Sequence, residues 1–221
     1  MLPIGPVCMA SNYFNAMFNG SFRESTAKAV VLREIDASTF EGVLKFIYTG
    51  DVSINSTNVY NLLEASEFFE LPGIEELCVE FFKEKPIMIG VESIWNIFMY
   101  AFTTKKNTLM EIILNDYIVE HFVIFSKSNR FYEIPFENVS LILKKYSSRP
   151  FRNEELLMGA LVQWICHATE ERYQYFLDLA TMIQFTDISS EYIRYMLWKL
   201  ITRDIASTPK PAGYDEALEL N

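Results

Sequence analysis

Apolar residues recur every three or four positions along most of the chain, which is the spacing of helices that bury one face. The clearest case predicts a helix over residues 39–49, with Ser38 and Glu41 as a capping box at its start. Gly50 follows the last apolar residue and can adopt the left-handed backbone that ends a helix. The apolar stripe of this helix consists of Phe40, Val43, Leu44, Ile47 and Tyr48.

The same spacing predicts helices along the rest of the chain, and one segment departs from it. Residues 28–35 are rich in β-branched and aliphatic side chains, which predicts the chain's one short strand. Asn153 is expected to cap a helix that carries Glu154 and Glu155 favourably in its first turn. The other predicted helices cover residues 11–18, 59–69, 74–85, 93–104, 108–122, 126–132, 136–146, 154–165, 169–179 and 189–201.

These elements predict a mainly α chain with two domains and a tail. Pro86 ends one run of helices, because the residue before a proline is disfavoured in the helical region. The expected domains are residues 1–85 and 86–201. Residues 202–221 contain Pro209, Pro211 and Gly213 without an apolar period, which favours a flexible tail.

Composition narrows the classes of partner. The formal net charge of -10 and pI near 4.8 repel phosphate backbones and anionic headgroups, so nucleic acid and membrane surfaces are not expected partners. No run reaches the roughly 18 uninterrupted apolar residues of a membrane span. The three cysteines are odd in number and lack metal or disulfide spacing, which fits a reducing compartment.

The chain lacks the residue patterns that catalysis requires. There is no glycine-rich phosphate loop, and Cys166 beside His167 does not form a nucleophile and base, because neighbours on a helix do not face each other. We interpret Cys166 as a structural thiol and His167 and His121 as residues of helix ends. The carboxylates of Glu64, Glu67 and Glu70 fit an exposed helix face. The sequence predicts no catalytic residue, cofactor or metal ligand.

Several segments in their order along the chain resemble known domains. CMASNYFNAMF at residues 8–18, SFRES at 21–25, FIYTGDV at 46–52 and NVYNLLEASEFFELPGIEELCVEFF at 58–82 resemble the second half of a BTB domain. EELLMGALVQWICHATEERYQYFLDLATMIQF at residues 154–185 is similar to a BACK domain. The chain thus resembles the BTB and BACK part of kelch-like adaptors for cullin-3 ubiquitin ligases.

The resemblance implies a function for Phe22, Arg23 and Glu24, which match the hydrophobic-x-Glu motif of cullin-3-binding BTB domains. An alternative is that Phe22 caps the local core. The resemblance also implies that the helix pair at residues 91–122 adds a groove for the cullin. Core packing is the alternative for its apolar residues Trp95, Phe98 and Met99.

The resemblance further implies how much of such an adaptor is present. The N-terminal half of the BTB fold and the kelch propeller are expected to be missing, which would weaken homodimers or heterodimers with other BTB proteins. The leading hypothesis is a non-enzymatic adaptor in ubiquitination and proteasomal degradation, located in the cytoplasm or nucleus. The alternative is a BTB-type oligomerisation or transcription-associated scaffold without a ligase role.

Overall fold

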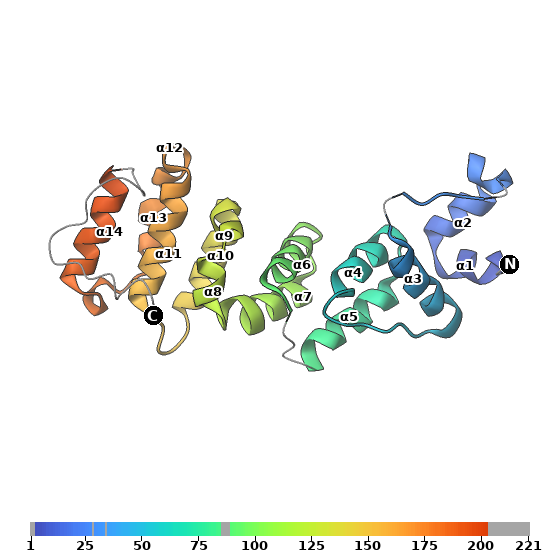
Figure 1. Ribbon diagram of the computed structural model, residues 1–221, viewed down its shortest axis with the longest axis horizontal. Helices are drawn as coiled ribbons and strands as arrows, with labels where there is room; N and C mark the ends of the chain where they lie inside the picture. Colours follow the sequence, from blue (N-terminus) through green and yellow to red (C-terminus); the bar gives the residue numbers. More distant parts are fainter. Residues whose placement is uncertain (1–2, 28, 34, 85–88, 203–221) are drawn as a thin grey trace. The chain divides into compact units, whose positions relative to one another are not determined.

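The computed structural model describes residues 3–27, 29–33, 35–84 and 89–202. The chain divides into two compact units, Met1–Ile113 and Leu114–Asn221, each built around its own core (Figure 1). The prediction of a mainly helical protein is confirmed. The predicted domain boundary after residue 85 lies outside the described residues, as does the predicted tail at 202–221 except for Thr202, which ends a helix, so both stay predictions.

In the first unit, neighbouring helices pack in pairs. Helix α4 packs on α3, α5 and α6, while α1 packs on α2 and α3. Helix α1 was not predicted, although Ile4, Val7 and Cys8 have helical spacing. The elements are α1 (Ile4–Ala10), α2 (Asn12–Asn19), the 3-10 helix η1 (Arg23–Thr26), α3 (Ala37–Thr49), α4 (Val59–Phe68), α5 (Pro72–Glu84), α6 (Val91–Thr103) and α7 (Asn107–Ile112).

The capping of α3 is partly as predicted. Gly50 has a φ of 73°, the left-handed value expected of it. The predicted N-cap Ser38 is wrong, because the helix begins earlier and Asp36 takes that position. One carboxylate oxygen of Asp36 accepts hydrogen bonds from the Thr39 N–H at 2.9 Å and the Ser38 hydroxyl at 2.6 Å. Ser38 therefore supports the cap instead of forming it.

An aromatic cluster joins α2, α3 and the end of α4. The rings of Phe14 and Phe69 stack with centroids 4.7 Å apart, and Phe40 lies 5.9 Å from Phe69. The buried Ser11 hydroxyl donates to the Phe69 carbonyl at 2.6 Å and accepts from the Phe14 N–H at 3.2 Å. Ser11 thus caps α2 and fixes it to the α4–α5 turn with one side chain.

The predicted strand at residues 28–35 is wrong for the part that the structure describes, which contains no strand. Residues 29–32 have no regular secondary structure. A strand requires a neighbouring strand for its hydrogen bonds, and β-branched composition does not supply one. Ala29, Val30 and Leu32 line a cavity, whereas Val31 is 79% exposed.

An ion-pair group ties the α6–α7 turn to two other helices of the first unit. The Lys106 ammonium lies 3.2 Å from the Glu67 carboxylate on α4 and 2.7 Å from the Glu75 carboxylate on α5. The hydrogen bond that Lys106 donates to Glu75 is the main cause that raises the pKa of Lys106 above its ordinary value. Glu67, which the sequence pattern assigns to an exposed helix face, therefore has a structural role.

The second unit is arranged around α11. This helix packs against α9, α10, α12, α13 and α14, and apolar side chains all round it are buried. Asn153 caps it as predicted, accepting a hydrogen bond from the Leu156 N–H at 2.9 Å. The elements are η2 (Ile113–Val119), α8 (Phe122–Ser126), α9 (Asn129–Glu133), α10 (Phe136–Ser147), α11 (Glu154–His167), α12 (Thr169–Arg172), η3 (Tyr173–Tyr175), α13 (Phe176–Ala180), η4 (Phe185–Asp187) and α14 (Ser190–Thr202).

Two long predicted helices are interrupted. The helix predicted over residues 108–122 is α-helical only to Ile112 and continues as the π-helical turn η2, in which all residues except Asn115 and Asp116 are buried. The helix predicted over residues 169–179 contains the 3-10 turn η3. Apolar periodicity does not distinguish these tighter and wider turns from a continuous α-helix.

Replacing Gly50 tests the left-handed cap of α3. We expect Gly50→Ala to lower the free energy of unfolding by about 1–2 kcal/mol, because a β-carbon is unfavourable at positive φ. Gly50→Asn should lose less, since asparagine tolerates this conformation. Urea unfolding followed by circular dichroism measures the difference, and an alanine variant as stable as the native chain would contradict the assignment.

Acid should weaken the start of α3. Hydrogen bonds, first from the Ser38 hydroxyl and then from Thr39, hold the pKa of Asp36 below its ordinary value of 3.8. A carboxyl with a lower pKa in the folded state stabilises the fold fully above its unfolded pKa, and this contribution declines below that value until it is lost as the pH falls through the folded pKa. We expect the melting temperature to fall progressively as the pH is lowered from about 5 to about 2, and to fall less in Asp36→Asn. An equal pH dependence of both proteins would disprove the role of Asp36.

Candidate protein-interaction site

At the start of the loop that follows α2, the backbone of Gly20 lies close to the last turn of that helix. The Gly20 N–H donates to the Ala16 carbonyl at 2.9 Å. A β-carbon on Gly20 would lie 2.3 Å from that same oxygen and 3.2 Å from the Phe22 ring. Glycine at this position therefore lets the chain leave α2 and bring Phe22 over the helix end.

Phe22 lies at the start of η1 and is held through its main chain. Its carbonyl accepts hydrogen bonds from the Ser25 hydroxyl at 2.7 Å and the Ser25 N–H at 3.2 Å. Its ring is 60% exposed, so Phe22 is not part of the unit's core. The backbone is fixed while the aromatic side chain is presented to solvent.

The two residues after Phe22 carry opposite charges and differ in how far they are exposed to solvent. Arg23 is exposed, and Glu24 is half-buried at the wall of a cavity. Neither side chain forms an ion pair within the described part of the chain. The structure thus places the three residues singled out from the sequence together on one short turn.

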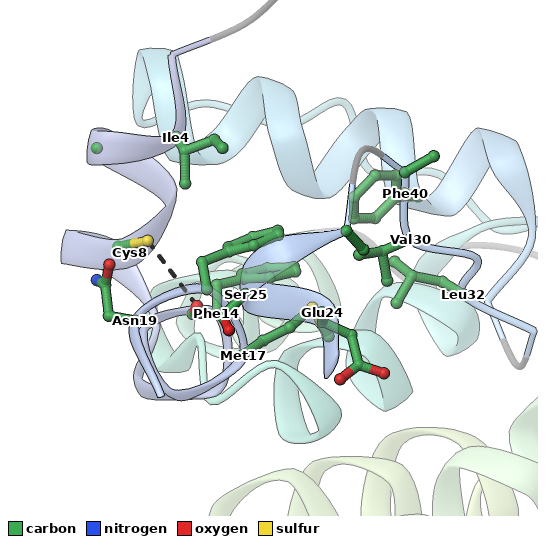
Figure 2. A pocket seen from close by; sticks show the side chains of 14 residues that line it. Ile4, Cys8, Phe14, Met17, Asn19, Glu24, Ser25, Val30, Leu32 and Phe40 are labelled. Atoms are coloured by element: carbon green, nitrogen blue, oxygen red, sulfur yellow. Dashed lines mark hydrogen bonds between the residues drawn. The ribbon is translucent and has the colours of Figure 1, made fainter. Parts of the chain in front are cut away.

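The cavity beside this turn has a volume of about 610 Å³ and is mainly apolar. In Figure 2, Val30 and Leu32 lie near Phe40 on one side, while Ile4 and Cys8 of α1 lie on another. Phe14 and Met17 come from α2, and Glu24 supplies a carboxylate at the wall (Figure 2). An apolar recess with one carboxylate is suited to binding a protein segment.

The sequence did not predict the contribution of α1 to this cavity. The first predicted helix starts at residue 11, so the helical spacing of Ile4 and Cys8 before it is not used in the prediction. Cys8 is additionally directed toward the Phe14 carbonyl, with its sulfur 3.8 Å from the oxygen. The spacing alone could have indicated this wall of the cavity.

The cysteine and the two histidines that were weighed as catalytic residues have surroundings that fit a structural role. Burial is the main cause that raises the pKa of the Cys166 thiol, which disfavours the reactive thiolate. The His167 ring stacks on Tyr132 with centroids 5.9 Å apart. The His121 Nδ1 atom lies 3.1 Å from the Tyr117 carbonyl oxygen. Within the described residues, no three His, Cys, Asp or Glu side chains are grouped so that they could hold a metal ion.

The apolar residues considered for a groove on the first BACK helices are mostly core residues. Trp95 and Phe98 are fully buried in α6, and Met99 is half-buried. The core interpretation is therefore correct for Trp95 and Phe98.

Among the helices that the structure describes, none has the length and apolar character needed to cross a membrane.

Comparison with known proteins finds two domains in this chain. A model of the BTB/POZ domain matches residues 7–86, and a model described as BTB And C-terminal Kelch, the BACK domain, matches residues 94–197. The expected loss of the N-terminal half of the BTB domain is not confirmed.

The chain is also similar to curated kelch-like proteins. It is 27% identical to Kelch-like protein 7 of Gallus gallus over 184 residues, which cover 83% of this chain and 30% of the relative. It is 26% identical to Kelch-like protein 2 of Homo sapiens over 186 residues, with the same coverage. The chain therefore spans about 30% of the length of these relatives. The BTB and BACK domains together support an adaptor-type protein-interaction module.

Replacing Gly20 tests how the site is positioned. We expect Gly20→Ala to destabilise the first unit by about 1–3 kcal/mol, because the new β-carbon meets a backbone oxygen. The Ser25 and Ala27 amides should also exchange faster with solvent, since their hydrogen bonds belong to the displaced turn. Hydrogen exchange measured by NMR checks this expectation. Gly5→Ala is the matched control, because nothing lies within 4 Å of its β-carbon, and equal protection in both variants would contradict the proposed constraint.

Proposed function

We propose that this chain acts as a substrate-adaptor module of a cullin-3 RING ubiquitin ligase. In this role, Phe22, Arg23 and Glu24 face the N-terminal domain of the cullin. Ubiquitin transfer occurs on other subunits, so the chain takes part in ubiquitination and proteasomal degradation without catalysing a reaction. The proposed places of action are the cytoplasm and the nucleus, and a second BTB chain is a further proposed partner.

The observation that carries the proposal is the exposed Phe22 ring on a fixed turn. A rigid aromatic loses little conformational freedom when it enters a partner's pocket, and aromatic anchors often dominate binding energy. The Ser25 hydrogen bonds to the Phe22 carbonyl supply that rigidity.

The acidic neighbour supports the same interpretation. Glu24 lies two residues from the anchor and has no ion-pair partner within the described residues. A carboxylate in this position can accept hydrogen bonds from donors of the partner and so fix its orientation. The BTB and BACK matches favour this class of partner.

Binding to the isolated cullin-3 N-terminal domain tests the proposal. We expect Phe22→Ala to weaken binding by about 10- to 30-fold and Glu24→Gln by about 3- to 10-fold, as for an aromatic anchor and a charged hydrogen-bond acceptor. Isothermal titration calorimetry with the full chain measures the dissociation constants of both variants and of the native chain.

Phe185→Ala is the matched control, since Phe185 is also an exposed phenylalanine at the start of a 3-10 turn, with 40% exposure. It should bind like the native chain. Absence of binding by the native chain would reject the adaptor role and favour an oligomerisation or transcription-associated scaffold. Unchanged binding of Phe22→Ala would remove the contact from this turn.

A further inference from the structure

The loop between α10 and α11 presents a second exposed aromatic residue. Residues 149–152, here called the Phe151 turn, lie in this loop, which projects from the ends of both helices in Figure 1. The Phe151 side chain is fully exposed, with a relative exposure of 104%. Its φ of 60° is in the left-handed region, where a bulky side chain is unfavourable and glycine is preferred.

The residue before the turn's proline is tied to the body of the second unit. The Arg149 N–H donates to the Tyr146 carbonyl at 3.1 Å. Its guanidinium donates to the Val119 carbonyl at 3.0 Å and pairs with the Glu120 carboxylate. The entry to the turn is therefore fixed by one backbone bond and one side chain.

The exit from the turn is fixed as well. The Arg152 guanidinium pairs with the Glu154 carboxylate at 2.5 Å, and Glu154 is buried. The other oxygen of Glu154 accepts a hydrogen bond from the Gln184 N–H at 3.0 Å. The Asn153 N–H donates to the Tyr146 hydroxyl at 3.2 Å. Phe151 is thus held outward between two anchored residues.

Folding does not account for a phenylalanine at this position. Its ring makes no ring contact among the described residues, it buries no apolar surface, and its backbone conformation favours glycine. Strained backbone that presents a side chain to solvent is a feature of binding sites. An exposed aromatic on a fixed turn can enter a partner's pocket with little loss of conformational freedom.

The charge around the turn indicates the chemistry of the partner. Residues 144–152 contain four basic residues and no acidic residue, whereas the whole chain has a net charge of -10. Arg149 and Arg152 are paired with Glu120 and Glu154, so the positive charge left for a partner is that of Lys144 and Lys145. Lys144 and Lys145 lie in the last turn of α10, and Lys144 is exposed. This local reversal of charge favours an acidic partner and steers its approach.

We infer that the Phe151 turn is a docking site for an acidic protein segment whose apolar residues receive the Phe151 ring and whose carboxylates face Lys144 and Lys145. A membrane surface is the weaker alternative, because one aromatic ring gives little insertion energy and the acidic chain repels anionic lipid. The inference is independent of the proposed cullin contact, which lies in the first unit.

A displayed library of random 12-residue peptides tests the inference. The library is selected on the full chain after depletion on Phe151→Gly, and the recovered peptide is synthesised and titrated by fluorescence anisotropy. We expect acidic residues next to leucine, isoleucine or an aromatic in that peptide. Its affinity should fall at least about tenfold in Phe151→Gly, and about threefold in Lys144→Glu with weaker dependence on salt.

Thermal melting separates binding from folding. Phe151→Gly should melt at the same temperature as the native chain or higher, because it relieves the left-handed strain. Lys105→Gly is the matched control, since Lys105 has a φ of 57° at another helix–helix turn, and it should leave peptide binding unchanged.

Four results would overturn the inference. The first is a recovered peptide that binds Phe151→Gly as tightly as the native chain. The second is a set of recovered peptides without acidic residues. The third is a lower melting temperature of Phe151→Gly, which would show that the ring has a structural role. The fourth is Phe151-dependent binding to phosphatidylserine vesicles in place of any acidic peptide.

Discussion

The first unit depends on the packing of Phe14 against Phe69. This stacked pair, together with the buried bond from Ser11 to the Phe69 carbonyl, fixes α2 to the turn between α4 and α5. Because α2 ends at Gly20, the same contact positions the turn that carries Phe22. The exposed Phe22 is therefore oriented by a buried aromatic contact of the helix that precedes it.

The second unit has a comparable arrangement around α11. This helix is covered by its neighbours on all sides, so the loop that enters it starts from a rigid base. Arg149 and Arg152 add ion pairs on either side of Phe151. In both units a buried frame holds the backbone of a short turn, and an aromatic side chain on that turn faces solvent. Such sites suit recognition of proteins, because the shape presented to the partner is already formed before binding.

The accuracy of each secondary-structure prediction depends on whether the contacts that stabilise the element lie near it or far from it in the sequence. Helices such as α3 and α11 were predicted well because their apolar stripes and caps lie within a few residues of one another. The strand at residues 28–35 was predicted wrongly because a strand is stabilised by a distant partner, which composition cannot show. The π-helical turn η2 was missed for a related reason, since its apolar residues have nearly the spacing of an α-helix.

The sequence by itself determined the helical class, most helix boundaries, the Gly50 and Asn153 caps, and the choice of Phe22, Arg23 and Glu24 as candidates. The helices and caps depend on periodicity, backbone preference and local order along the chain, whereas the three candidates come from the resemblance of this segment to the motif of cullin-3-binding BTB domains. The tertiary structure alone decided that Phe22 is exposed, that Trp95 and Phe98 are buried, and that α1 lines a cavity with Glu24. It alone placed Phe151 outward in a left-handed conformation. Exposure and cavities arise from contacts between segments far apart in the sequence, and local patterns do not encode which segments meet.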